Sequence, residues 1–357
     1  MINRYLILFL PLLFYYFITP GIFLFENDIS TNSVFFSEVS FINQYLDTNL
    51  FIYNFFSILA LIIIFYYYYF ILQKIKAVKG KEFILVFYFL IFICMFFIII
   101  DIFNIIKYYI NTEIVYRSTL YNDLLDKRNT HINILLLLSV SIYNDNRKLS
   151  LLGLSLIIIF SFLSLSRIEL ILIFSMLLFI IEIKKKNYLT FFIIFGLIIF
   201  SILYRFYYTN QSLVYVLFDP LHLFLSTIKF LNNFTIDNFS ILLKDNFNFL
   251  LKDFFYLNYT VKNYFVSNEL PTYSLRGIDS IINYPIVFLL YSTIITMLIK
   301  TLTVNHEFRK CIFIFLVISL FRGHFIHNLG FIIKLYLLIV SLEWIIRKLK
   351  SFILKVD

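Results

Sequence analysis

Charged residues are scarce in this chain: Asp, Glu, Lys and Arg make up 14% of its 357 residues, whereas 61% are hydrophobic. A soluble domain contains roughly 25% charged and about 45–50% apolar residues, so one soluble core could not bury this excess. Glycine and proline are also few, at 7 and 5, which excludes fibrous and linker-dominated proteins. Helices embedded in a lipid bilayer are the arrangement consistent with these scarcities.

Cysteine and the common catalytic motifs are also lacking. The two cysteines, Cys94 and Cys311, fall inside apolar runs without zinc-site spacing, and we interpret them as small hydrophobic residues. The chain has no P-loop, no GxGxxG and no GxSxG, so ATP-driven transport and serine hydrolysis have no support. Carboxylates in series inside the apolar runs, as in a proton relay, are nearly missing. We expect neither a metal nor a cofactor.

Acidic residues are fewer than basic residues, at 21 Asp and Glu against 30 Lys and Arg, and the formal net charge is +9. The basic residues are scattered between apolar runs, which favours a role in membrane orientation over nucleic-acid binding. We predict about ten spans, near residues 5–25, 50–72, 83–106, 131–143, 149–165, 168–183, 188–204, 284–302, 311–321 and 329–346. The basic clusters then fall on one side of the membrane. The prediction is an all-α polytopic protein, one integral membrane domain over 1–357, with both termini cytoplasmic.

The one long interruption of the apolar pattern covers residues 205–284. We predict that this stretch is a large external loop, rich enough in Phe, Tyr, Leu and Ile to fold against the membrane. Within it, apolar residues of Ser240–Tyr256, such as Leu243, Phe247 and Leu250, repeat at helical spacing. This predicts an amphipathic helix on the membrane surface, which either packs over the helix bundle or covers a lipid-linked substrate.

Arginines recur on the predicted external side. Arg167 lies at the outer end of the fifth span, Arg205 and Arg276 lie near the two ends of the large loop, and Arg322 lies with His324 in the last outer turn. Guanidinium groups stay charged and offer paired donors that match phosphate oxygens. These positions therefore predict a receptor for a phosphate group.

Structural interpretations of these residues stay open. Arg167 could pair with Glu169 or extend to the interface, Arg205 could be an interfacial anchor, and the others could be solvated loop residues. Asp101, near the outer end of the third span, is a weaker candidate for a functional role. The remaining candidates, His131, His222 and His306, are interpreted as structural.

Two short stretches carry a resemblance to a known family: SLSRIEL at 164–170 and SLFRGHFIHNLG at 319–330, before the last span. With the many spans and the large external loop, the chain resembles the Wzy-type polymerases of O-antigen and capsule repeat units, and more loosely the O-antigen ligases. The resemblance implies a glycosyltransferase that joins oligosaccharides carried on undecaprenyl diphosphate, at the outer face of the bacterial inner membrane. Implied partners are this substrate, membrane lipid and a chain-length regulator protein, without nucleic acid.

The resemblance also implies roles for individual residues. Arginines would stabilise the charge that develops on the leaving diphosphate without a metal. The expected catalytic residues are Arg167, Arg276, Arg322 and His324, and the expected diphosphate- or sugar-binding residues are Arg205, Arg117, Asp219 and Asp279. The general base stays open between His324 and a carboxylate of Asp219, Glu169 or Asp279.

Other functions remain as alternatives. A flippase or other transporter would have short loops and often repeat symmetry, neither of which is evident here. A metal-dependent sugar transferase would use carboxylates of the first external loop, where Glu26, Asp28 and Glu38 occur without adjacent acids. A ligase or a non-catalytic assembly protein is the remaining class. The sugars, the linkage and the oligomeric state do not follow from the sequence.

Overall fold

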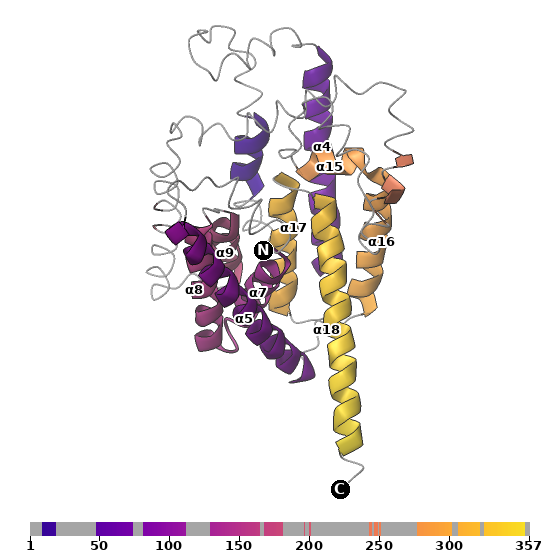
Figure 1. Ribbon diagram of the computed structural model, residues 1–357. Coiled ribbons are helices and arrows are strands. Elements are labelled where there is room, and N and C mark those ends of the chain that lie inside the picture. The colour runs from indigo at the N-terminus through magenta and orange to yellow at the C-terminus, as the bar shows by residue number, and fades with distance from the viewer. Residues whose placement is uncertain are drawn as a thin grey trace. The chain divides into compact units, whose positions relative to one another are not determined.

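The computed structural model describes residues 9–18, 48–73, 81–111, 129–164, 168–180, 277–301, 306–321 and 325–353, with single positions at 196 and 200 and the short stretch 243–244, 246–248 and 250 (Figure 1). Nearly all of these residues are helical, and no strand occurs among them. The predicted all-α class is confirmed for this part of the chain. The residues outside these ranges include most of the predicted external loop.

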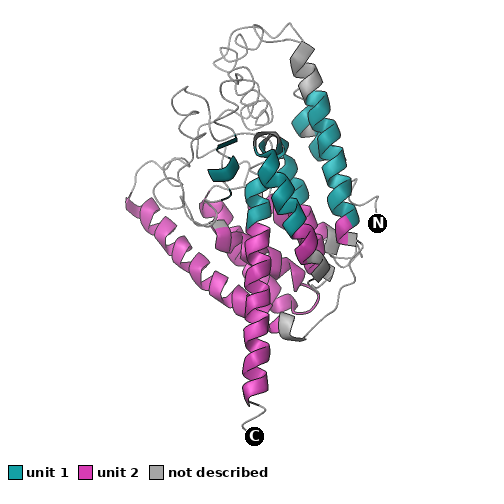
Figure 2. Cartoon of the chain, turned by 90° about the vertical axis from the view of Figure 1, so that its right-hand side faces the viewer, with its two compact units in different colours: residues 1–70, 217–294, 316–330 teal, residues 71–216, 295–315, 331–357 magenta. Residues whose placement is uncertain are grey.

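Two compact units divide the chain (Figure 2). Unit 1 consists of residues 1–70, 217–294 and 316–330, and unit 2 of residues 71–216, 295–315 and 331–357. Both units draw on segments that are distant in the sequence, so neither is a separate stretch of chain. The prediction of one integral membrane domain stays a prediction.

Three helices are long and apolar enough to cross a membrane. They are α4 (Thr48–Gln73), α5 (Lys81–Asn111) and α18 (Phe325–Ile353), and crossing the hydrocarbon core takes about 20 residues. Shorter apolar helices are found within α7 (Asn129–Ser141), α9 (Ile168–Ile180) and α16 (Pro285–Thr301). The described residues therefore support a membrane protein, whereas the number of about ten spans stays a prediction.

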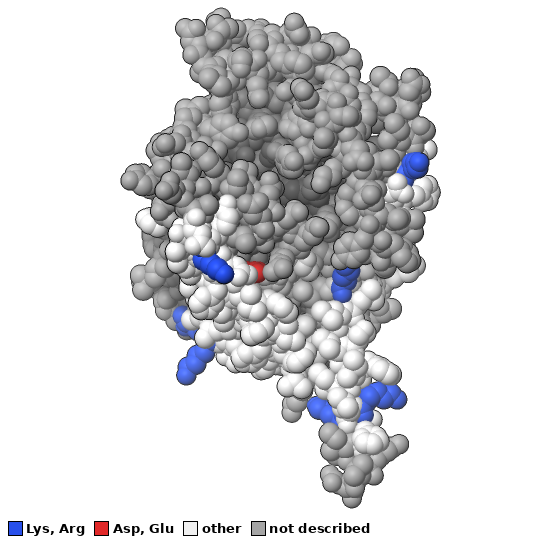
Figure 3. Space-filling view, in the orientation of Figure 1, with Lys and Arg blue, Asp and Glu red and all other residues white. Residues whose placement is uncertain are grey.

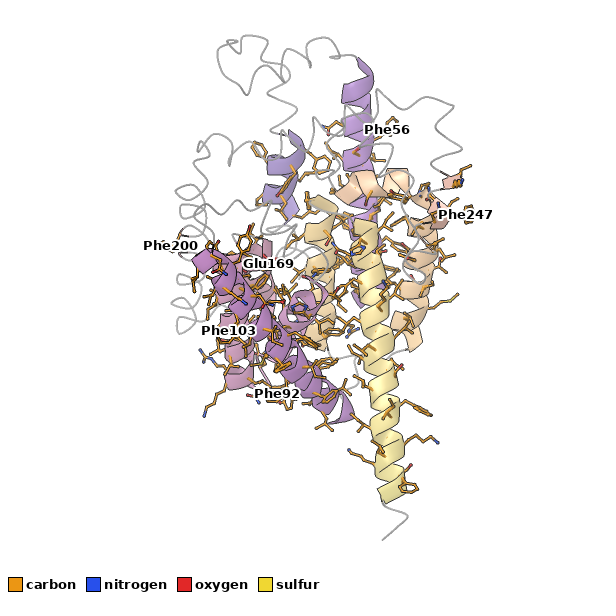
Figure 4. The ribbon with its side chains drawn as sticks, in the orientation of Figure 1. Phe56, Phe92, Phe103, Glu169, Phe200 and Phe247 are labelled. Atoms are coloured by element: carbon orange, nitrogen blue, oxygen red, sulfur yellow. The ribbon has the colours of Figure 1, made fainter. Side chains whose placement is uncertain are left out.

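One face of α5 has the composition expected of a helix surface that contacts lipid. Phe92 is 60% and Phe103 68% exposed, and with Leu85, Phe89 and Phe96 they form an outward stripe at helical spacing (Figure 4). The opposite stripe, which includes Phe87, Ile91, Cys94, Ile98, Asp101 and Ile105, is buried. An outward row of large apolar side chains is costly in water and suits hydrocarbon.

Four helices, α5, α7, α8 (Arg147–Leu163) and α9, pack together in unit 2. The side chain of Asn146 begins α8 by accepting a hydrogen bond from the Leu149 amide at 3.2 Å, which satisfies one of the free donors at a helix start. A Cβ atom on Gly153 of α8 would lie 2.3 Å from Ser139 Oγ of α7. Glycine at this position thus permits the close approach of α7 and α8.

The last two helices are longer than predicted. Helix α17 (His306–Phe321) begins five residues before the expected start at Cys311, because Glu307 in its first turn favours a helix N-terminus and pairs with Lys310 at 3.2 Å. Helix α18 runs from Phe325 to Ile353 instead of residues 329–346. No glycine or proline interrupts residues 331–353, so nothing in this stretch favours an earlier end.

The amphipathic helix predicted at 240–256 is described at six positions, 243, 244, 246, 247, 248 and 250, and all of them are helical. Phe247, on the predicted apolar face, is 56% exposed and points outward (Figure 4), whereas Asn246 is buried. This exposure favours a face directed to lipid over one packed on the bundle. Whether the helix covers a substrate stays a prediction.

Candidate functional sites

Seven of the residues predicted to act in catalysis or binding lie outside the described residues: Arg117, Arg167, Arg205, Asp219, Arg276, Arg322 and His324. The eighth, Asp279, belongs to the short helix α15 (Gly277–Asn283). The described structure ends immediately beside several of these positions, since residue 276 precedes α15, residue 167 precedes α9, and residue 322 follows α17. The neighbouring helix ends therefore provide the geometry considered below.

The start of α15 packs directly against the last turn of α17, both in unit 1. A Cβ atom on Gly277 would lie 1.7 Å from the carbonyl oxygen of Ser319 and 2.8 Å from the carbonyl carbon of Leu320. Backbone meets backbone here, so only glycine fits at position 277. The start of α15 and the end of α17 are thereby in contact. In the sequence, Arg276 is one residue before Gly277, and Arg322 is two residues after Leu320.

The end of α17 and the start of α18 are held by contacts of the residues on either side of positions 322–324. Asn328 donates a hydrogen bond from its side-chain nitrogen to Ser319 Oγ at 2.7 Å. Phe321 and Phe325, which flank residues 322–324, are buried. The ring of Phe321 lies 5.5 Å from that of Phe9, and the ring of Phe325 lies 6.0 Å from that of Tyr68. The end of α17 and the start of α18 are thus both anchored in the apolar core of unit 1.

We refer to Gly277, Ser319, Phe321, Phe325 and Asn328 together as the unit 1 platform. All of them belong to the two sequence stretches YSLRGIDS and SLFRGHFIHNLG. Their packing is local, and buried aromatic contacts constrain the side chains of Phe321 and Phe325. The platform thus fixes the end of α17, the start of α18 and the start of α15 in unit 1.

A carboxylate and an imidazole meet inside unit 2. Nε2 of His131 on α7 lies 2.7 Å from Oδ2 of Asp101 on α5, and the two side chains are 17% and 6% exposed. The His131 ring also lies 6.1 Å from the ring of Phe97. Ionisable side chains on apolar helices are expensive to bury and usually serve a function or have a partner. The Asp101–His131 pair is therefore a second candidate site.

The pair lies toward the end of the four-helix group at which α5 and α8 end and α7 and α9 begin. Tyr109 Oη, two turns beyond Asp101 on α5, donates to the carbonyl of Leu163 at 2.8 Å and so joins the ends of α5 and α8. Helix α9 starts five residues later, and its first turn holds the buried carboxylate of Glu169 (Figure 4). The three acid or base groups are thus carried by helix segments at one end of this unit.

Sequence reasoning did not connect Asp101 with His131. It rated Asp101 as a weaker candidate and His131 as structural, because the two residues are far apart in the sequence and belong to no motif. One signal was available: Asp101 is the one carboxylate between Ile84 and Asn111, and it lies on the stripe of α5 that the helical period buries. A buried carboxylate requires a partner, and His131 opens the next apolar stretch.

The charges elsewhere on the described surface do not form a comparable site. On the face shown in Figure 3, basic side chains are scattered over the described residues, and Arg347, Lys348 and Lys350 are exposed near the end of α18. Among the described residues, no group of three or more His, Cys, Asp or Glu could hold a metal ion.

No protein-family model, curated protein or solved structure matches the chain.

Proposed function

We propose that this protein is a membrane glycosyltransferase that polymerises surface polysaccharide, as the resemblance to the Wzy-type polymerases implies. Its substrates are oligosaccharide repeat units on undecaprenyl diphosphate, and the reaction takes place at the outer face of the bacterial inner membrane. The chain crosses this membrane about ten times with both termini in the cytoplasm. Apolar helices with exposed aromatic faces, such as that of α5, suit a substrate whose carrier is itself a membrane lipid.

In the proposed reaction, a hydroxyl oxygen of one lipid-linked unit attacks the anomeric carbon of the growing chain. The bond from that carbon to the lipid diphosphate breaks, its electron pair leaves with the diphosphate, and a glycosidic bond forms. Arg167, Arg276 and Arg322 would bind the diphosphate and stabilise its developing charge. Arg205, Arg117, Asp219 and Asp279 would contact the diphosphate or the sugars, and His324 would lie beside the reacting groups.

One structural observation supports this proposal most directly: the unit 1 platform. The backbone contact between Gly277 and Ser319 joins the stretches that contain Arg276 and Arg322, which were predicted from the sequence to act together. The bond from Asn328 to Ser319 joins the start of α18 to the end of α17. Arginines at positions 276 and 322, which adjoin α15 and α17 in the sequence, would suit a bidentate receptor for a diphosphate.

The proposal is tested by deleting the gene in its source strain and resolving the surface polysaccharide by chain length. Deletion is expected to replace the ladder of polymer lengths with single repeat units, and the wild-type gene is expected to restore it. Arg167→Ala, Arg276→Ala and Arg322→Ala should fail to restore the ladder while the proteins still accumulate. Lysine at these positions should rescue poorly, because a bidentate site needs the planar guanidinium.

Arg147→Ala is a matched control, since Arg147 is exposed at the start of α8 and lies 5.6 Å over the Tyr143 ring. It should restore a normal ladder. A normal ladder from all three site variants would contradict the diphosphate assignment. If the protein were a flippase, deletion would instead leave single units on the cytoplasmic side. If it were a ligase, deletion would leave polymer on the lipid carrier. Activity that is lost with chelator and restored by a divalent ion would indicate the metal-dependent transferase.

A further inference from the structure

The proposed polymerisation releases a proton from the attacking hydroxyl, and the sequence left its acceptor open. We propose that His131, held by Asp101, accepts this proton; the inference rests on the proposed function and adds the acid–base step to it. The observation behind it is the 2.7 Å contact between Asp101 Oδ2 and His131 Nε2 on two packed apolar helices. Neither residue belongs to the stretches SLSRIEL, YSLRGIDS and SLFRGHFIHNLG, which contain Arg167, Arg276 and Arg322.

The chemistry of the pair suits a proton acceptor. A neutral imidazole accepts a proton near neutral pH, where a hydroxyl or a guanidinium does not. A carboxylate in contact with one ring nitrogen orients the ring and stabilises the imidazolium that forms. In this step the hydroxyl proton moves to His131 as the glycosidic bond forms, and it then passes to water, which restores the neutral ring.

The position of the pair also fits this role. His131 is the third residue of α7 and is 17% exposed at its side chain, so it lies near a helix end and is accessible to a small extent. In the sequence, Arg167 immediately precedes α9, and α9 packs against α7. The proton acceptor and the start of α9 thus belong to the same group of four helices.

Other titratable groups near this end must be separated from the pair. In the described parts of the four helices, they are Lys107, Tyr108 and Tyr109 on α5 and Glu169 on α9. In the half that holds the pair, the polar side chains of α8 and its C-cap are those of Ser161 and Ser164, and neither is an acid or a base. Glu169 is the one further carboxylate there among the described residues, so Glu169→Gln is included as a separate variant.

The experiment uses the full-length protein in proteoliposomes and lipid-linked units extracted from the source strain with this gene deleted. The initial rate of polymer formation is measured against pH. The wild-type rate should fall toward acidic pH, because a protonated imidazole cannot accept a proton. His131→Gln should lower the rate by at least about 100-fold and remove this acidic limb. Asp101→Asn should lower the rate at least about tenfold, and Asp101→Glu should retain more activity.

Two comparisons separate a proton acceptor from a purely structural ion pair. Asp145→Asn, in the exposed turn between α7 and α8, should leave both the rate and the pH profile unchanged. The double variant Asp101→His with His131→Asp keeps one acid and one base in contact. It should therefore recover the thermal stability that the single variants lose, without recovering the rate of polymer formation. Recovery of the rate by the exchanged pair would overturn the proposal.

The possible failures are distinguishable. If the wild-type protein forms no polymer at any pH, the proposed function and the role of the pair both fail. If it forms polymer and His131→Gln keeps the rate or the acidic limb, only the pair is wrong. If Glu169→Gln alone removes the acidic limb, Glu169 is the acceptor. If His131→Gln fails to accumulate, Asp101→Asn decides, since an unchanged rate and pH profile in that variant would refute the pair.

Discussion

At the scale of single residues, the contact between Gly153 and Ser139 sets the distance between α7 and α8. A methyl group at 153 would lie 2.3 Å from Ser139 Oγ and 3.2 Å from Ser139 Cβ. Gly153→Ala should therefore lower the free energy of unfolding by about 1–3 kcal/mol, through overpacking. Thermal unfolding of the purified protein in detergent measures this change.

The same contact offers its own control. Ser139→Gly removes the side chain that the new methyl group would meet, so the double variant should recover most of the stability lost in Gly153→Ala. The double-mutant cycle isolates the interaction of the two positions. Additive effects would mean that the helices tolerate the methyl group by moving apart, and that the close approach is not specified by this pair.

The buried cation Arg309 has a partner that the sequence alone does not indicate. Arg309 falls between the predicted spans 284–302 and 311–321, yet its side chain is 5% exposed within α17, and Nη1 donates to the carbonyl of Leu72 at 3.3 Å. Burial lowers the pKa of its guanidinium from the usual value, although such a group stays charged at neutral pH. It thereby satisfies a carbonyl in the last turn of α4, a partner 237 residues away that no local pattern indicates.

At the scale of elements, the position of α15 depends on one glycine. Because the backbone of Ser319 and Leu320 fills the space beside Gly277, Gly277→Ala should displace α15 from α17 and lower the unfolding free energy by about 1–3 kcal/mol. If the unit 1 platform holds the diphosphate-binding arginines, polymer formation should fall in the same variant at temperatures well below its midpoint of unfolding.

Gly196→Ala is the matched control, since a Cβ atom at 196 would meet nothing within 4 Å. Alanine is the better helix former, so this substitution should be neutral or slightly stabilising. Gly277→Ala with full stability and a normal polymer ladder would contradict the packing of α15 on α17. Loss of stability with a normal ladder would retain the packing but remove its proposed functional consequence.

The elements themselves follow from the sequence better than their partners do. Long apolar runs predict α4, α5 and α18, because the bilayer allows few alternatives to a helix; α4 and α5 contain no glycine or proline, and α18 contains none after Gly330. Their ends are less certain, since polar residues such as Glu307 and Lys310 extend α17 through interactions among themselves. The Asp101–His131 pair and the platform contacts arise from packing between distant segments, which apolar periodicity in a single sequence does not encode.

At the scale of the whole molecule, orientation in the membrane is the property on which the proposed function depends. The positive-inside pattern predicts that the exposed basic end of α18 and the start of α8 face the cytoplasm, whereas residues 205–284 lie outside. Single cysteines at the exposed Lys148, Lys244 and Lys350, in a chain with Cys94→Ala and Cys311→Ala, report these three places directly.

A membrane-impermeant maleimide applied to intact spheroplasts should label Lys244→Cys, because this position lies in the predicted external loop. It should label Lys148→Cys and Lys350→Cys only after the membrane is opened. The three variants must also retain polymer formation, so that labelling reports the active orientation. Labelling of Lys244→Cys from the cytoplasmic side would place the predicted external loop on the cytoplasmic side. The proposed polymerisation at the outer face would then be wrong.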